Sequence, residues 1–119
     1  MTEHKPVTES EMEEFKETLR RCPEGTLEAL LLYRQTKDSN ALHTFLAGCI
    51  KRHADDEYYE VLDNGGSGVS FIDDLGIDSM TMMEIVMMVE SCLGMQIDNQ
   101  DLMRIQTLGD LDTYIQKSL

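Results

Sequence analysis

The sequence predicts an all-α fold, and three observations lead to this prediction. Apolar residues recur at helical spacing in several separate segments. Glycines, prolines and small polar residues lie between those segments, as is typical of the turns that join helices. No segment shows the alternation of polar and apolar residues that is typical of a strand. Because 119 residues suffice for one modest core, we expect a helical bundle.

Residues 1–37 predict an N-terminal helical extension. Residues 1–7 form a polar tail that we expect to be frayed. Residues 9–21 predict the first helix, because apolar side chains recur on one of its faces. These side chains belong to Met12, Phe15, Leu19 and Cys22.

A second helix is predicted from Thr26, its expected N-cap, to about residue 35, and Pro23 separates it from the first. Its inward-facing residues are Leu27, Leu30 and Leu31. Helices this short are marginal alone in water, so they must pack on something. We expect them to pack on the chain's own bundle, near the helix that contains residues 42–50.

The remaining residues, 38–119, predict the main domain. Its first helix covers residues 40–53 and carries a one-sided apolar stripe. This stripe consists of Leu42, Phe45, Leu46, Cys49 and Ile50. A helical turn is expected around residues 58–62, followed by a long Gly-rich loop in which Gly65, Gly66 and Gly68 disfavour regular structure.

Three more helices complete the predicted bundle. The clearest covers residues 79–93 and ends at Gly94, as helices often do. A short helix is expected near residues 99–104. The last helix begins at Thr107 or Asp110 and directs Leu111, Tyr114 and Ile115 inward.

The charge of the chain restricts its partners. Asp and Glu total 23 against 10 Lys and Arg, which gives a formal net charge of -13. Such a surface repels nucleic acid and anionic membranes and attracts basic proteins. We therefore expect neither nucleic-acid binding nor membrane insertion.

Three cysteines, Cys22, Cys49 and Cys92, lie far apart in the sequence. An odd number without close spacing argues against a disulfide framework and against a zinc site. Cys49 and Cys92 fall within apolar runs and are expected to be small core residues. With no signal peptide and no apolar run of membrane-spanning length, the chain is expected to be cytoplasmic.

The helix over residues 79–93 has two apolar faces. On a helical wheel, one face forms the expected core stripe, namely Met82, Ile85, Val86, Val89 and Leu93. The opposite face carries Met80, Met83, Glu84, Met87 and Ser91, and Glu90 borders it. Flexible thioethers beside carboxylates suit a partner-binding surface. The alternative is that another part of the chain covers this face.

Ser79 stands where an acidic loop becomes this helix. Either Asp78 or Ser79 could cap the helix. Alternatively, the Ser79 hydroxyl could carry a phosphoester, because a helix N-terminus favours an attached anion. Neither a nearby histidine nor a G-x-S-x-G motif supports a hydrolase nucleophile here.

The segment FIDDLGIDSMTMMEIVMMVESCLGMQI resembles the phosphopantetheine attachment region of acyl carrier proteins. The matching residues are Phe71, Asp74, Leu75, Gly76, Asp78, Ser79 and Glu84, and the likeness continues through Ile97 and Ile105 to Ile115. This resemblance implies a carrier-type bundle without catalytic activity of its own. It implies that a phosphopantetheinyl transferase attaches phosphopantetheine to Ser79, and that the thiol of this arm holds acyl groups as thioesters in fatty acid or polyketide synthesis.

The resemblance also implies the partners. Acyl-processing enzymes with basic patches would dock on the helix after the serine, through Asp78, Met80, Met83, Glu84, Met87 and Glu90. Thr81 and Ser91 stand where many relatives carry acids, so docking here is expected to rely more on methionine. We expect a monomer.

In relatives that sequester the acyl chain, the chain enters between the bundle helices. The positions that match their pockets are Phe71, Val86, Val89, Leu93, Ile97, Ile105, Leu111 and Tyr114. The same residues are also expected to be ordinary core.

Parts of the sequence are also compatible with three other functions. An aminoacyl or peptidyl group could replace the acyl cargo, or the chain could be an unmodified interaction module. The segment DNGGSGVSFIDD also resembles an EF-hand calcium loop, with Asp63 and Asp74 at its first and last positions. Gly65 stands where that loop needs an acid, so no metal site is expected.

Overall fold

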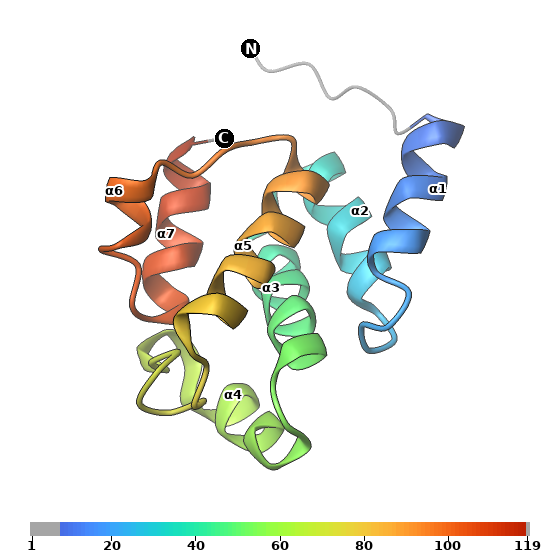
Figure 1. Cartoon of the computed structure of the whole chain (residues 1–119). Coiled ribbons are helices and arrows are strands. Elements are labelled where there is room, and N and C mark those ends of the chain that lie inside the picture. Colours follow the sequence, from blue (N-terminus) through green and yellow to red (C-terminus); the bar gives the residue numbers. More distant parts are fainter. Residues whose placement is uncertain (1–7, 119) are drawn as a thin grey trace.

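The protein is a helical bundle, described by a computed structural model over residues 8–118 (Figure 1). Within that range the α-helices are α1 Glu9–Thr18, α2 Thr26–Thr36, α3 Ser39–His53, α4 Tyr59–Gly65, α5 Ser79–Leu93, α6 Asn99–Leu102 and α7 Leu108–Ser118. Two short 3-10 turns, η1 Asp56–Tyr58 and η2 Gly66–Gly68, flank α4. The predicted polar tail over residues 1–7 lies outside the described residues. The all-α prediction is confirmed.

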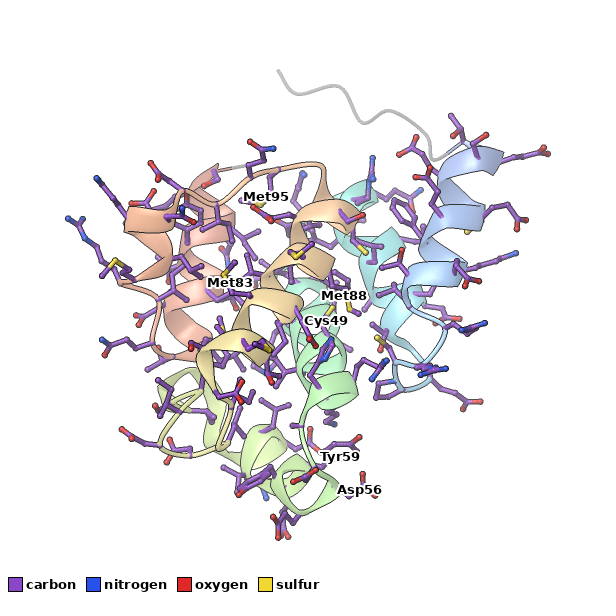
Figure 2. The ribbon with its side chains drawn as sticks, viewed as in Figure 1. Cys49, Asp56, Tyr59, Met83, Met88 and Met95 are labelled. Atoms are coloured by element: carbon purple, nitrogen blue, oxygen red, sulfur yellow. The ribbon has the colours of Figure 1, made fainter. Side chains whose placement is uncertain are left out.

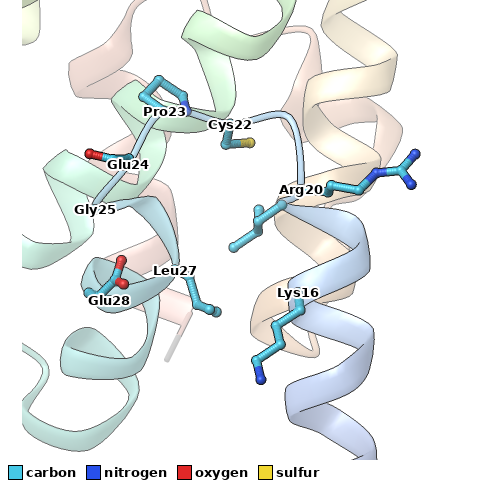
Figure 3. Close-up of a pocket in the computed structure, with 9 residues that line it drawn as sticks. Lys16, Arg20, Cys22, Pro23, Glu24, Gly25, Leu27 and Glu28 are labelled. Carbon is cyan, nitrogen blue, oxygen red and sulfur yellow. The ribbon is translucent and has the colours of Figure 1, made fainter.

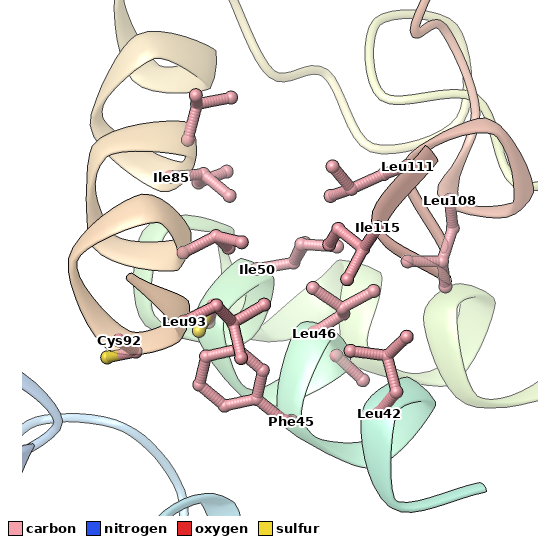
Figure 4. Close-up of a cluster of buried hydrophobic side chains, with 14 of the residues drawn as sticks. Leu42, Phe45, Leu46, Ile50, Ile85, Cys92, Leu93, Leu108, Leu111 and Ile115 are labelled. Atoms are coloured by element: carbon pink, nitrogen blue, oxygen red, sulfur yellow. The ribbon is translucent and has the colours of Figure 1, made fainter. Parts of the chain in front are cut away.

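Helix α3 lies at the centre of the bundle and contacts α2, α4, α5 and α7. Figure 4 shows side chains from α3, α5 and α7 meeting in one core. Phe45, Leu46 and Ile50 of α3 are fully buried there, beside Ile85 of α5 and Ile115 of α7. The apolar stripe predicted for α3 is therefore confirmed, and it has helices on more than one side.

The N-terminal extension packs on the bundle, as expected. Helix α2 contacts α3, and α1 contacts α5, which the sequence did not indicate. Phe15 of α1, Leu19 just after α1, and Leu30 and Tyr33 of α2 are all buried in the same core as α3 and α5. In Figure 1, α1 and α2 lie on one side of α5, and α6 and α7 lie on the other.

Two predicted helix boundaries in the extension were wrong. Helix α1 ends at Thr18 rather than at residue 21, because the chain turns at Leu19 and places Cys22 outside the helix. Thr26 is not the N-cap of α2. Gly25, with φ of 93°, occupies that position, while the buried Thr26 hydroxyl donates to the Pro23 carbonyl at 2.7 Å.

Two further boundaries also differ from the predictions. Gly65 was expected in a loop but forms the last residue of α4, and η2 continues the helical turn from Gly66. Helix α6 ends at Leu102, two residues early, because Arg104 N–H bonds back to the Asp101 carbonyl at 3.0 Å. The predicted start of the last helix at Thr107 is confirmed, because α7 begins at Leu108 and Thr107 Oγ1 accepts from the Asp110 N–H as a cap.

Helix α5 has the bounds that the sequence predicted, Ser79–Leu93. Gly94 ends it in the left-handed conformation, with φ of 65°. The loop before α5 is tied to the chain before α7 by an isolated bridge between Ser70 and Thr107. The N–H of Phe71 donates to Gln106 O at 3.0 Å, and the N–H of Leu108 donates to Val69 O at 2.9 Å. These bonds fix where the chain enters α5.

Candidate functional site

The loop before α5 is folded by its own side chains. Asp74 Oδ2 accepts from the Ser70 N–H at 2.8 Å, and Ser70 Oγ accepts from the Asp73 N–H at 3.2 Å. Gly76 takes φ of 63°, which favours glycine, and a Cβ there would lie 3.2 Å from the Tyr58 hydroxyl. Leu75 is buried. Asp74, Leu75 and Gly76 therefore stabilise the conformation of this loop, and the loop fixes the direction in which the chain enters α5.

Asp78 rather than Ser79 caps α5. Its Oδ1 accepts from the Thr81 N–H at 2.8 Å. This hydrogen bond from the Thr81 backbone is stronger to the ionised carboxylate, so it holds the pKa of Asp78 below its ordinary value. Ser79 is the first residue of the helix and is exposed, and its Oγ makes no hydrogen bond within residues 8–118. The Ser79 hydroxyl is thus free for chemistry.

A pocket of about 510 Å³ opens beside Ser79. It lies between the loop before α5, the first turn of α5 and the α6 region. Ser79 and Asp78 line it, and most of the remaining lining is apolar, namely Phe71, Ile72, Met82, Met83, Leu102, Met103 and Ile105. An apolar cavity next to a free hydroxyl can take the apolar part of a group attached there.

Helix α5 exposes the methionine face that the sequence predicted. Met80, Met83 and Met87 are 75%, 49% and 63% exposed, and Figure 2 labels Met83 on α5. Ile72 and Met103 are also exposed, at 68% and 80%, and they line the same pocket as Met83. Ile72 was missed because it lies in a loop, where helical spacing gives no signal about exposure. The apolar surface around Ser79 is therefore wider than one helix face.

The two predicted docking glutamates differ in their surroundings. Glu84 is exposed, and its Oε2 lies 3.4 Å from His53 Nδ1 on α3. Glu90 is half-buried, and its Oε2 accepts from the Ile97 N–H at 2.7 Å. Glu90 therefore helps to hold the chain after α5, whereas the Glu84 side chain, 57% exposed, faces solvent.

The predicted acyl-pocket residues do not all line one cavity. Phe71 and Ile105 line the pocket beside Ser79. Five others are buried in the core cluster: Val86, Val89, Leu93, Ile97 and Leu111. Tyr114 is half-buried, and its hydroxyl donates to Asp101 Oδ2 at 3.0 Å. Of the eight candidates, therefore, only Phe71 and Ile105 line the pocket beside Ser79.

The segment that resembles a calcium loop has another structure. Asp63 lies within α4, and its Oδ1 pairs with Lys51 Nζ at 2.7 Å. The carboxylate of Asp74 accepts from the Ser70 N–H. The two acids of the presumed loop therefore face separate partners. Among residues 8–118, no three His, Cys, Asp or Glu side chains gather as metal ligands.

The described part of the chain also offers no helix with the length and apolar character needed to cross a bilayer.

In a comparison with known protein families, residues 61–115 match the family described as "Phosphopantetheine attachment site". This range contains the loop, all of α5 and most of α7. No solved structure gave a significant match.

Two relatives illustrate the likeness to curated proteins. The chain is 50% identical to the meromycolate extension acyl carrier protein of Mycobacterium leprae over 48 residues, which cover 40% of this chain and 42% of that protein. It is 48% identical to the acyl carrier protein of Thermotoga maritima over 48 residues, which cover 40% and 59%. The chain thus matches about half the length of these relatives.

Proposed function

We propose that this chain, whose residues 61–115 belong to the phosphopantetheine attachment family, is an acyl carrier protein with Ser79 as its attachment site. One observation carries the proposal: the Ser79 hydroxyl is exposed, free of hydrogen bonds within residues 8–118, and beside an apolar pocket. The chain presents cargo to enzymes and is not itself an enzyme.

The residues around Ser79 fit a phosphopantetheine group. Because Asp78 supplies the cap, Ser79 Oγ can carry a phosphoester without loss of the cap. The N-terminus of a 15-residue helix favours a phosphate through its unpaired N–H groups and its dipole. When bound, the arm supplies a terminal thiol that holds an acyl group as a thioester. Phe71, Met83 and Ile105 offer apolar contact to whatever the arm carries. An apolar lining suits an acyl cargo better than an aminoacyl one.

The proposed partners are a phosphopantetheinyl transferase and acyl-processing enzymes of fatty acid or polyketide synthesis. Exposed Met80, Met83 and Met87 provide adaptable apolar contact, and Glu84 provides a carboxylate for a basic patch. A net charge of -13 favours the approach of basic enzymes. We further propose that the chain acts as a monomer in the cytoplasm, where a reducing environment suits its free cysteines.

The test is modification of the purified chain by coenzyme A and a broad-specificity phosphopantetheinyl transferase, followed by intact mass spectrometry. The wild-type chain should gain one phosphopantetheine, and Ser79→Ala should gain none. Ser39→Ala is the matched control. Ser39 is also the first, exposed residue of a helix, and Asp38 caps that helix by accepting from the Asn40 N–H at 3.0 Å.

The Ser39→Ala variant should be modified like the wild type, because the α3 N-terminus lacks the family motif. Modification of Ser79→Ala, or loss of modification in Ser39→Ala with the fold intact, would contradict the proposed site.

A further inference from the structure

Charge is distributed unevenly along the chain. Residues 16–52 contain seven of the ten Lys and Arg residues but only four of the 23 Asp and Glu residues, so this stretch has a formal charge of +3. The rest of the chain has three bases against 19 acids and a formal charge of -16. The cationic stretch runs from the second half of α1 to the last turn of α3. It attracts carboxylates, whereas the rest of the chain attracts bases.

The turn between α1 and α2 brings part of this stretch to α5. Cys22 Sγ in that turn lies 3.9 Å from Met88 Sδ of α5, and α1 itself contacts α5. Arg20 and Arg21 immediately precede Cys22 in the sequence, and both are exposed. Two cationic residues therefore lie beside the edge of α5 that carries Met88.

The end of α3 brings a further cation to the same edge. Gly48 of α3 faces the turn, because the Thr26 side chain fills the space where a Cβ of Gly48 would lie. Arg52, four residues later, lies one turn further along that face of α3. The next residue, His53, has its Nδ1 3.4 Å from Glu84 Oε2 of α5. Arg52 is therefore placed between the turn and α5.

Two of these three cations have no carboxylate partner within residues 8–118. Arg20 pairs with Glu17 at 3.6 Å, whereas none of the ion pairs in this range includes Arg21 or Arg52. Arg21 is exposed and Arg52 is half-buried. We call Arg20, Arg21 and Arg52 the cationic rim. Its charge is available to a partner.

The corner between α1 and α2 is hollowed beside the rim. A pocket of about 520 Å³ opens there, with Lys16 and Arg20 on its α1 side and Glu24 and Glu28 on its α2 side. Figure 3 shows the Arg20 side chain directed away from both glutamates. The glutamates of α2 therefore do not pair with the rim, and the α1 side of the pocket remains cationic.

The docking face of α5 has a different neighbour at each edge. Met83, at one edge, lines the pocket beside Ser79. Met88, at the other edge, contacts the turn that carries part of the rim. On a helical wheel the exposed Glu84 lies between these two methionines. Across α5 a partner therefore meets apolar surface, then a carboxylate, and then the cationic rim.

We propose that the cationic rim is part of the docking surface, and that it fits an acyl-processing enzyme with a carboxylate beside the basic group that meets Glu84. The proposal rests on the proposed function, because it takes α5 as the docking helix. The rim repels an enzyme whose docking patch is basic throughout, since like charges that face each other oppose binding. The N-terminal extension, which supplies Arg20 and Arg21, thus selects the partners of the carrier.

The test measures peptide binding to the full chain with Ser79→Ala, so that the result does not depend on attachment of phosphopantetheine. Two helical peptides of identical composition serve as probes, and each has one face of leucines. In the segregated peptide, lysines border one edge of this face and glutamates border the other. In the scrambled peptide, both edges carry both residues. The segregated peptide should bind roughly fivefold more tightly at low salt, and the difference should vanish at about 0.5 M NaCl.

Three further substitutions in this chain assign the difference to the rim. Arg21→Glu should reduce it to less than about twofold, and Arg52→Gln should reduce it in part. Lys117→Glu changes the charge as Arg21→Glu does, at an exposed position of α7, and should leave the difference unchanged. Equal binding of the two peptides, or an equal loss in Lys117→Glu, would overturn the proposal. A wild-type chain that takes up no phosphopantetheine would instead overturn the proposed function.

Discussion

Substitution of Glu84 can test partner docking with little effect on the stability of the fold. Its side chain is 57% exposed and pairs only with His53, at 3.4 Å, among the described ion pairs. An exposed pair of this kind contributes little to stability. A charge on the rim of a docking surface mainly affects how fast partners associate.

We therefore predict that Glu84→Lys lowers kcat/KM of the phosphopantetheinyl transferase roughly tenfold, while the free energy of unfolding changes by less than about 1 kcal/mol. Glu60→Lys changes the same charge on the exposed side of α4 and should leave kcat/KM near the wild-type value. Val89→Asp, at a fully buried position, should unfold the protein. If Val89→Asp folds and Glu84→Lys does not, then the core face and the docking face of α5 have been exchanged in this assignment.

At the residue scale, the sequence predicted the exposed methionines of α5 because helical spacing separates its two faces. It could not decide between Asp78 and Ser79 as the cap, since both are good caps and only the hydrogen bond to Thr81 distinguishes them. It also could not show that Glu90 bonds to the Ile97 N–H, because that contact depends on the path of the chain after Gly94.

His53 of α3, which faces Glu84 of α5, makes the stability of the protein depend on pH. The His53 side chain is 12% exposed and its Nε2 is buried without a partner among the described residues. Burial, followed by the nearby charge of Arg52, lowers the pKa of His53 from its ordinary 6.5, and Glu84 opposes this shift. The folded protein therefore binds a proton at His53 less readily than the unfolded chain does.

This shift predicts the direction of the pH dependence. The stability contribution of neutral His53 is fully present above pH 6.5 and is lost as the pH falls from 6.5 toward the lower pKa of the folded state. Urea unfolding at about pH 7.5 and about pH 5.5 measures the difference. His53→Gln should reduce the difference in the free energy of unfolding between these two pH values. His43→Gln, on the same helix, should show the same difference as the wild type. If the wild type and His53→Gln lose the same free energy of unfolding between the two pH values, the assignment of the pH dependence to His53 is wrong.

At the scale of elements, the sequence predicted every helix of the main domain and the full extent of α5. The errors lie at helix ends, where the path of the chain competes with helical propensity. Gly65 was assigned to a loop because glycine disfavours helices, yet it ends α4, where the Val69 side chain closes over it. Helix α1 stops at Thr18 because the chain then forms tight turns, in which the N–H of Arg20 donates to Glu17 O and the N–H of Cys22 donates to Leu19 O.

The N-terminal extension and the bundle share one core in the whole molecule. Leu30 and Tyr33 are buried with the residues of α3. Arg34 of α2 adds polar contacts, with its Nη1 3.4 Å from Glu11 Oε2 of α1 and donating to the Cys92 carbonyl of α5 at 3.4 Å. The guanidinium carbon also lies 5.3 Å from the centre of the Phe15 ring. One side chain thus links three helices.

We predict that a chain truncated to residues 38–119 is still modified at Ser79 but is less stable, with a Tm at least about 5 °C lower, because α3 loses its cover. Thermal unfolding by circular dichroism measures the shift, and the transferase assay shows whether the site survives. Equal Tm values for the truncated and full chains would show that the extension adds no stability. Loss of modification in a folded truncated chain would contradict the division into an extension over residues 1–37 and a carrier domain.

At this largest scale the sequence indicated that the extension packs on α3, because a short connection keeps neighbouring helices close. It gave no sign that α1 reaches α5 or that Cys22 meets Met88, since both contacts join residues that are distant in the sequence. The pocket beside Ser79 was only partly predicted. Phe71 and Ile105 follow from the family likeness, whereas Ile72 and Met103 are brought to Ser79 by loops.

The central claim is that Ser79 carries phosphopantetheine, and the most direct test is the intact mass of the full chain purified from its own cells under conditions that preserve thioesters. The account predicts a mass gain of one phosphopantetheine, with or without an acyl group, and fragmentation that places the gain on the peptide containing Ser79. Treatment with hydroxylamine should release the acyl group and leave the arm. A chain isolated entirely without added mass, or with the arm on another residue, would contradict the account.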